Sequence, residues 1–173
     1  MKTQYHTATS IDGFIATEDD SLDWLFPLGD ANDTSYPAFI AQVRALAMGR
    51  ATYEWILRHA DKVVAEMGLP WPYAQLAWIF FSRALRSIEG AASIRFVQGD
   101  VRPVHAEMSK AAGSKNIWIV GEGDLAGQVY DAGLLDEVIV QVGSVALGRG
   151  KPLFPRRVTR PSRSSHSVAP VLA

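Results

Sequence analysis

The stretch "LAMGRATYEWI", residues 46–56, has the pattern of a buried strand that ends where a helix begins. Gly49, Arg50 and Thr52 stand at this junction. The free N–H groups and the dipole of a helix's first turn favour an anion, and a preceding glycine lets a phosphate approach the backbone. Arginine offers a forked donor to phosphate oxygens, and threonine caps the helix or donates to the ligand. The junction is therefore a candidate phosphate site, with an ordinary turn, surface arginine and cap as the alternative.

A second junction of this kind follows the apolar segment 117–120, where Gly121 and Gly123 precede another helical pattern. Ligands of open α/β sheets bind outside the carboxyl ends of the strands, so both junctions should face one edge and could hold a diphosphate. Ser82 and Arg83, at the end of the apolar run "LAWIFF", would add a hydroxyl and a cation to that edge. Together these residues predict a phosphorylated adenosine as ligand.

Gly121, Gly123 and Gly127 also form G-x-G-x-x-x-G, which raises the alternative of a Rossmann dinucleotide-binding domain. The Rossmann fingerprint normally opens the first βαβ unit, whereas this one begins after 120 of 173 residues. Too little chain follows to complete that fold, and we rank this interpretation below the first.

Composition sets the class of protein. A chain of 173 residues with 48% apolar and 20% charged residues is typical of one globular domain. The net charge of -1 gives no reason to expect nucleic acid or an anionic membrane as partner. No run of apolar residues is long enough for a membrane span, the first residues do not resemble a secretory signal, and cysteine is absent, so we expect a cytoplasmic protein. The four histidines show no ligand spacing, and we expect no metal.

Strand and helix patterns alternate along the chain. We expect a strand bent at Asp12-Gly13, a long loop over 18–35 with an aromatic plug, a helix over 38–46 and a short strand ending at Gly49. Further helices are expected over 50–63 and 103–113 and from Gly123 to near Gly133, and strands over 76–81, 93–100, 116–120 and 136–148. This order predicts an α/β fold around a largely parallel sheet.

Four segments resemble one family. "AMGRATYE", "FFSRAL" and "IVGEGDL" resemble the corner motifs of dihydrofolate reductases. "TSIDGFIA" and "GLLDEVIVQVGSVALGRGKPLF" are closer to the reductase half of the bifunctional riboflavin-biosynthesis deaminase-reductase and to its stand-alone bacterial relatives. The resemblance implies a three-layer dihydrofolate reductase-like fold over residues 1–155, with helices on both faces of a twisted, mostly parallel sheet, and NADPH as cofactor.

By position, the resemblance implies that Gly49, Arg50 and Thr52 hold the phosphates and the side of the adenosine 2′-phosphate, where Ser82 and Arg83 would assist. The remaining implied cofactor residues wrap the diphosphate or receive the nicotinamide. The diphosphate set is Gly121, Glu122, Gly123, Asp124 and Leu125, and the nicotinamide set is Ala8, Ile15 and Ala16. Relatives have a cis peptide at the glycine corner, which implies a cis bond between Gly121 and Glu122.

Hydride transfer is chemistry of the nicotinamide, so the protein needs few side chains beyond those that position the two reactants. The resemblance places Asp12 nearest the nicotinamide, as a substrate anchor or proton relay, which makes it the catalytic candidate. The alternative is a turn-forming Asp before Gly13. Trp24 and Leu25 lie in the position of the family's active-site loop and would form an apolar wall for a flat heterocycle, or serve the core instead.

The chain departs from the family at two places. Glu122 is second in the corner and Gly121 first, whereas the riboflavin enzymes place a glutamate first, which puts the pathway in doubt. Residues 156–173 are rich in Arg, Ser and Pro where relatives continue with a strand, so we expect a basic tail, and a sheet edge that a homodimer would cover.

We therefore expect an NADPH-dependent reductase of a pyrimidine- or pterin-like substrate, resembling 5-amino-6-(5-phosphoribosylamino)uracil reductase. One alternative is dihydrofolate reduction, which needs a carboxylate after Trp24, where only Asp30 and Asp33 are available. The other is a non-catalytic, dimeric nucleotide-binding module of the same fold.

Overall fold

A computed structural model describes residues 1–29, 34–61, 71–80 and 93–159. Its central feature is a six-stranded sheet in the order β5-β4-β3-β6-β1-β7, in which every neighbouring pair is parallel. A two-stranded antiparallel sheet, β2-β8, lies beside it. The elements are β1 (Thr3–Ser10), β2 (Phe14–Ala16), the 3-10 helix η1 (Phe26–Leu28), α1 (Tyr36–Ile40), β3 (Val43–Gly49), α2 (Arg50–Arg58), β4 (Leu76–Phe80), β5 (Ile94–Val97), α4 (Val101–Ala112), β6 (Asn116–Val120), α5 (Gly123–Asp131), β7 (Glu137–Gly143) and β8 (Lys151–Pro152).

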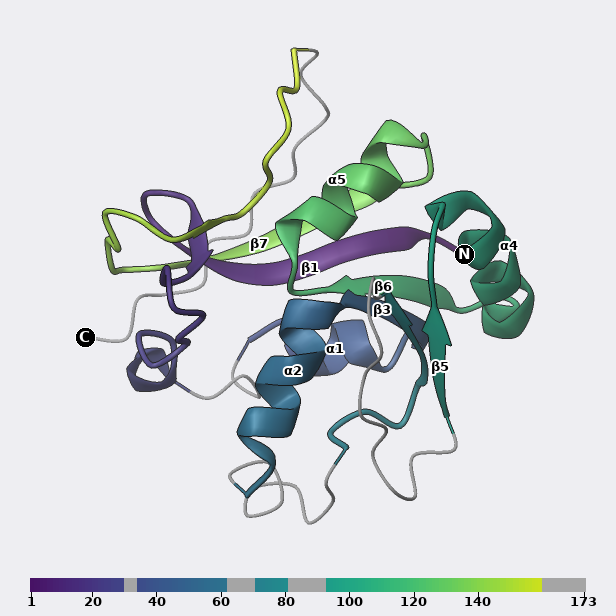
Figure 1. Cartoon of the computed structure of the whole chain (residues 1–173), viewed down its shortest axis with the longest axis horizontal. Coiled ribbons are helices and arrows are strands. Elements are labelled where there is room, and N and C mark those ends of the chain that lie inside the picture. The colour runs from purple at the N-terminus through teal and green to yellow at the C-terminus, as the bar shows by residue number, and fades with distance from the viewer. Residues whose placement is uncertain (30–33, 62–70, 81–92, 160–173) are drawn as a thin grey trace.

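The sheet is covered on both faces, which is why the strands β3, β4 and β6 are mostly apolar. Alternate residues of a strand point to opposite faces. In β3, Ala45 and Ala47 pack in a core with α4 and α5, whereas Leu46 and Met48 pack in a second core with α1 and α2. Figure 1 shows these two pairs of helices on opposite sides of the sheet. The predicted three-layer α/β fold is confirmed.

The helix predicted over 38–46 is present only as far as Ile40, and the prediction is wrong for the residues of β3. The helix α1 ends at Ile40, and β3 begins at Val43 and runs to Gly49. Because both faces of β3 are buried, its apolar residues do not alternate with polar ones as they do in a half-exposed strand. That continuous run fits a buried helix equally well when only the sequence is read.

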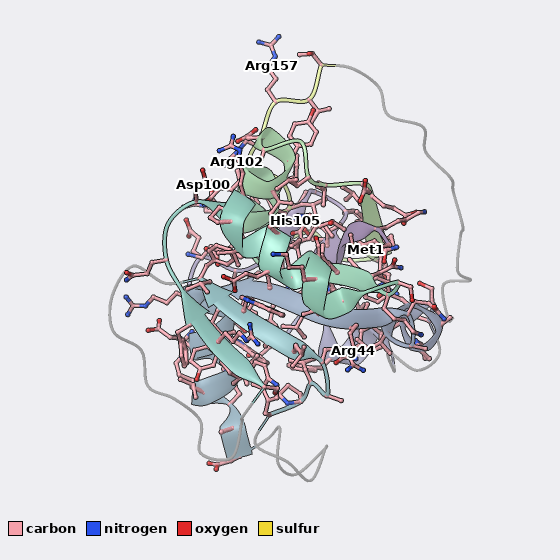
Figure 2. All side chains as sticks on the ribbon, turned by 90° about the vertical axis from the view of Figure 1, so that its right-hand side faces the viewer. Met1, Arg44, Asp100, Arg102, His105 and Arg157 are labelled. Atoms are coloured by element: carbon pink, nitrogen blue, oxygen red, sulfur yellow. The ribbon has the colours of Figure 1, made fainter. Side chains whose placement is uncertain are left out.

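The helix α4 shows the local signals that fix its ends. The Asp100 side chain accepts a hydrogen bond from the backbone N–H of Arg102 at 2.9 Å and caps the first turn. Gly113, with φ of 62°, ends the helix as expected. Figure 2 shows Asp100 and Arg102 at the start of α4 and His105 farther along it. His105 Nε2 lies 2.8 Å from the Thr3 hydroxyl oxygen, which joins α4 to β1.

The last described segment returns to the domain. Arg156 Nε donates to Asp131 at 2.7 Å and its Nη1 to Asp124 at 3.1 Å, so this side chain is bound along α5. Figure 2 shows Arg157 projecting away from the fold. The rest of the predicted tail, 160–173, lies outside the described residues. No helix within the described ranges is long and apolar enough to cross a membrane.

Candidate cofactor and substrate site

The two glycine junctions lie side by side at one edge of the sheet. Strands β3 and β6 are parallel neighbours, with Met48 opposite Val120, so Gly49, the last residue of β3, and Gly121, which follows β6, lie at the carboxyl ends of adjacent strands. A Cβ added to Gly121 would lie only 2.6 Å from the Thr52 hydroxyl oxygen, so the junctions are in direct contact. The predicted geometry, two helix starts facing one rim, is present.

A cavity of about 270 Å³ opens at this rim. Its walls come from the carboxyl ends of β3, β4, β5 and β6 and from the first turns of α2 and α5. Four of the predicted cofactor residues are among those that line it. The lining is Gly49, Arg50, Phe80, Gly99, Glu122, Leu125 and Gln128.

Glu122 reaches across the gap toward the other junction. A Cβ added to Gly49 would lie 1.3 Å from Glu122 Oε2, so the carboxylate rests directly against the bare Gly49 backbone. That oxygen is buried and has no hydrogen-bond partner among the residues that the structure describes. Burial raises the pKa of Glu122, and repulsion from Asp124 and Asp20 raises it further. The site therefore holds a carboxyl group that is poorly stabilised when ionised.

Arg50 lines the cavity, and its guanidinium group pairs with a carboxylate of its own helix, α2. Its Nε and Nη2 both lie 2.7 Å from Glu54 Oε1, an i,i+4 pair on α2. The side chains are about 40% exposed, so this pair is a weak one that a phosphate could replace.

The glycine corner differs from the expectation in one respect. The peptide between Gly121 and Glu122 is trans, so the expected cis bond is wrong. Gly121 makes the turn by adopting φ of 70°, a left-handed conformation that glycine reaches without strain.

The segment that contains β8 packs against the glycine corner at Gly123. A Cβ added to Gly123 would lie 2.5 Å from the Leu153 carbonyl oxygen and 2.6 Å from that of Pro152. The Tyr5 hydroxyl lies 2.8 Å from the Gly121 carbonyl oxygen and 2.9 Å from that of Leu153. These contacts give Gly123 a packing reason as well as the predicted binding role.

Asp12 is held in a tight network at the turn between β1 and β2. Its Oδ1 accepts from the Ser10 hydroxyl at 2.5 Å and from the N–H of Leu147 at 3.1 Å, and its Oδ2 accepts from the N–H of Gly148 at 2.7 Å. The Ser10 hydroxyl, followed by the Leu147 and Gly148 N–H groups, lowers the pKa of Asp12 below its ordinary value. This arrangement supports the turn-forming interpretation, and the catalytic role stays a prediction.

The predicted nicotinamide and substrate residues gather near the ends of β1 and β7. Trp24 and Leu28 pack over Gly143, since a Cβ there would lie 3.0 Å from Trp24 Cζ3 and 2.5 Å from Leu28 Cδ1. Leu25 begins η1 as its N-cap residue. Ala8 is half-buried in β1, and Ile15 and Ala16 form β2 with Phe14. Two predicted residues, Ser82 and Arg83, and both Asp30 and Asp33 lie outside the described residues.

A second cavity of about 330 Å³ lies between the acidic loop and α2. Trp24 and Leu25 are not part of its wall. The Trp55 indole stacks on the His59 ring at 4.2 Å, which gives this wall an aromatic surface. The lining is Asp19, Asp20, Ser21, Asp23, Trp55, Arg58 and His59. Over the described ranges, no three His, Asp or Glu side chains gather closely enough to hold a metal ion.

Sequence reasoning missed several residues of the first cavity. Phe80 is the last residue of β4, and Gly99 follows β5 by two residues, so the strand-end rule applied to Gly49 could have found both. Gln128 lies one helical turn beyond Asp124 and donates to it at 2.8 Å.

Comparison with known proteins identifies the class. The model of the RibD C-terminal domain family matches residues 75–164, and the chain belongs to this family. The chain is 33% identical to YwjB of Bacillus subtilis (strain 168) over 153 residues, which cover 88% of this chain and 82% of YwjB. A crystal structure described as a riboflavin biosynthesis protein from Shewanella sp. PV-4 matches with 27% identity and a TM-score of 0.74, covering 94% of this chain and 88% of that one. Dihydrofolate reductase from Enterococcus faecalis, complexed with NADP(H), matches with 17% identity and a TM-score of 0.55, covering 90% and 77%. The fold is thus dihydrofolate reductase-like, and the family indicates a reductase of the riboflavin-pathway kind.

Proposed function

We propose that the protein is an NADPH-dependent reductase of a pyrimidine- or pterin-like heterocycle. The observation that carries the proposal is the cavity at which the two glycine junctions, Gly49 and Gly121, meet beside the carboxyl ends of four parallel strands. The family supports reduction, and the dihydrofolate reductase of the same fold is complexed with NADP(H). A solved structure of a pyrimidine reductase-like protein also shares the fold, and its description supports the proposed substrate class.

The chemistry of this corner fits a dinucleotide diphosphate. The N-termini of α2 and α5 offer free N–H groups, Gly49 has no side chain of its own to block a phosphate, and Arg50 lines the cavity. The exception is the Glu122 carboxylate, which rests against Gly49 in this conformation.

When bound, NADPH would supply a hydride from its nicotinamide, and the protein would position that ring against the heterocycle. We propose that Ala8, Ile15 and Ala16 receive the ring. Trp24 and Asp12 would border the substrate. A reductase that uses NADPH also suits the reducing cytoplasm, where we place it.

NADPH titration tests this proposal. At a hundred times its dissociation constant, NADPH should raise the free energy of unfolding by about 2.7 kcal/mol, which thermal unfolding measures as a higher Tm. Turnover is then followed as loss of NADPH absorbance with pyrimidines, pteridines and dihydrofolate. A folded sample with no Tm shift contradicts the proposal. Binding without oxidation of NADPH by any of these substrates supports the non-catalytic module instead, and turnover with dihydrofolate alone supports the dihydrofolate reductase alternative.

Replacing Asp12 with Asn separates its two possible roles. Since the native pKa is lowered, the ionised carboxylate stabilises the fold above the ordinary Asp pKa, and that contribution is lost as the pH falls through the native pKa. The Tm difference between wild type and Asp12→Asn should therefore be largest near neutral pH and shrink in acid. A proton relay predicts in addition a lower kcat with an unchanged Kd for NADPH, whereas a purely structural Asp12 predicts loss of Tm with kcat retained.

We also propose a second copy of the chain as partner. The strand β7 pairs only with β1, so its outer edge is open within the described ranges. Val138 and Val142 on this strand are 47% and 64% exposed. Pairing of two β7 edges would satisfy the open backbone groups and cover these valines. Light scattering after size-exclusion chromatography distinguishes one chain from two.

A further inference from the structure

Glu122 lies where a phosphate would approach the start of α2. Gly49 is the N-cap residue of that helix, and its side-chain position is filled by the carboxylate of Glu122 from the neighbouring junction. The same carboxylate lines the cavity of about 270 Å³. An anionic ligand group at this point and an ionised Glu122 would occupy the same space with the same sign of charge.

Nothing described around this carboxylate fixes it in the ionised form. Glu122 Oε2 is buried without a hydrogen-bond partner. The nearest cation of the cavity wall, Arg50, is paired with Glu54. Tyr5 lies on β1, the neighbour of β6. Its hydroxyl donates to the backbone carbonyl of Gly121 or of Leu153 and not to the Glu122 carboxylate.

Two aspartates near Glu122 add to the effect of burial, and each of them is paired with a cation. Asp124 lies in the first turn of α5, for which Glu122 is the N-cap residue, and Arg156 Nη1 lies 3.1 Å from its carboxylate and partly compensates its charge. Asp20 approaches from the loop after β2 and pairs with Lys151 of β8 at 3.5 Å. Both aspartates favour the protonated form of Glu122, and burial favours it more strongly.

We infer that Glu122 sets the affinity of this corner for phosphate groups, because a diphosphate binds when the carboxylate gains a proton and gives up the space beside Gly49. The inference rests on the proposed function and deepens it by coupling cofactor binding to uptake of one proton from solvent. Glu122 is then a residue that weakens phosphate binding at alkaline pH, and no other described residue of the cavity wall has this property.

The test compares wild type with Glu122→Gln, which keeps the shape of the side chain and removes its charge. Kd values for NADPH and for inorganic pyrophosphate are measured by calorimetry between pH 6 and pH 8.5. We expect Glu122→Gln to bind both about tenfold more tightly than wild type at the alkaline end of this range, with a difference that grows with pH and shrinks as the pH falls toward the raised pKa of Glu122. The titration of the NADPH phosphate itself is common to both proteins and cancels in the ratio.

Three further measurements sharpen the comparison. Asp131→Asn removes the same charge from the far end of α5 and should change either Kd less than about threefold. Calorimetry in buffers of different ionisation enthalpy should show proton uptake on binding to wild type at pH 8 that Glu122→Gln lacks. Without ligand, Glu122→Gln should raise the Tm at pH 8, and this gain should vanish toward the ordinary Glu pKa of about 4.3, since a raised native pKa costs stability only where the group ionises.

The outcomes separate the inference from the proposed function. Equal Kd values for wild type and Glu122→Gln at pH 8, or proton uptake that persists in the variant, overturn the inference and leave the reductase proposal standing. Tighter pyrophosphate binding by Glu122→Gln with no binding of NADPH by either protein supports the inference and contradicts the reductase. Binding of neither ligand to either folded protein contradicts both.

Discussion

Arg50→Ala should weaken NADPH binding by about 10- to 150-fold while the Tm of the free protein hardly changes. The loss is that of a charge-assisted hydrogen bond to a phosphate, converted from its free energy to a ratio of Kd values. The small effect on Tm follows from the only ion pair that Arg50 makes among the described residues, an exposed i,i+4 contact with Glu54. Fluorescence titration with NADPH measures the change in Kd, and thermal unfolding of the free proteins measures the change in Tm.

Glu54→Gln is the matched control for this variant. It breaks the same ion pair from its other end and leaves the guanidinium at the cavity mouth. We expect NADPH binding that is equal to or tighter than that of wild type. If Arg50→Ala and Glu54→Gln weaken binding equally, the intact pair matters and the phosphate site is misplaced. An unchanged Kd in Arg50→Ala leads to the same conclusion.

Gly123→Ala should lower the free energy of unfolding by about 1–3 kcal/mol, the usual cost of an overpacked core position. The new Cβ would meet the carbonyl oxygens of Pro152 and Leu153 at 2.6 and 2.5 Å, and backbone atoms cannot turn aside as a side chain does. Either the start of α5 or the segment that contains β8 must move. Urea unfolding at equilibrium measures the loss.

Gly127→Ala, on the same helix, provides the comparison. There a new Cβ would meet the side chain of Arg156, at 2.7 Å from its Cζ, and a flexible side chain can move. Its ion pairs with Asp124 and Asp131 would be disturbed, but alanine is better than glycine in a helix interior by about 1 kcal/mol. A near-neutral result is expected. Losses of equal size at Gly123 and Gly127 would show that backbone crowding is not the cause.

Residue patterns predicted the fold because the strongest local signals agree with the tertiary structure. Gly113 ends α4, and Asp12-Gly13 turns the chain between β1 and β2. The junctions at Gly49 and Gly121 were found because a strand end followed by a helix start is visible in sequence. The helix predicted over 38–46 failed because a strand buried on both faces lacks the alternation that distinguishes strand from helix.

The candidate site was harder to predict, since its character depends on contacts between distant segments. The position of Glu122 in the corner is visible in sequence. Its contact with Gly49, 73 positions earlier, follows only from the pairing of β3 with β6. The network that holds Asp12 needs Leu147 and Gly148, which come from the far end of the chain. Sequence thus located the residues, and the topology decided what each of them touches.

The support that Pro152 and Leu153 give to Gly123 has a practical consequence for anyone who produces this protein. A substitution or an inserted tag near Pro152 would disturb a strand of only two residues, β8, whose neighbouring carbonyl oxygens pack against the start of α5. Changes made to improve expression or solubility should therefore leave residues 151–153 as they are.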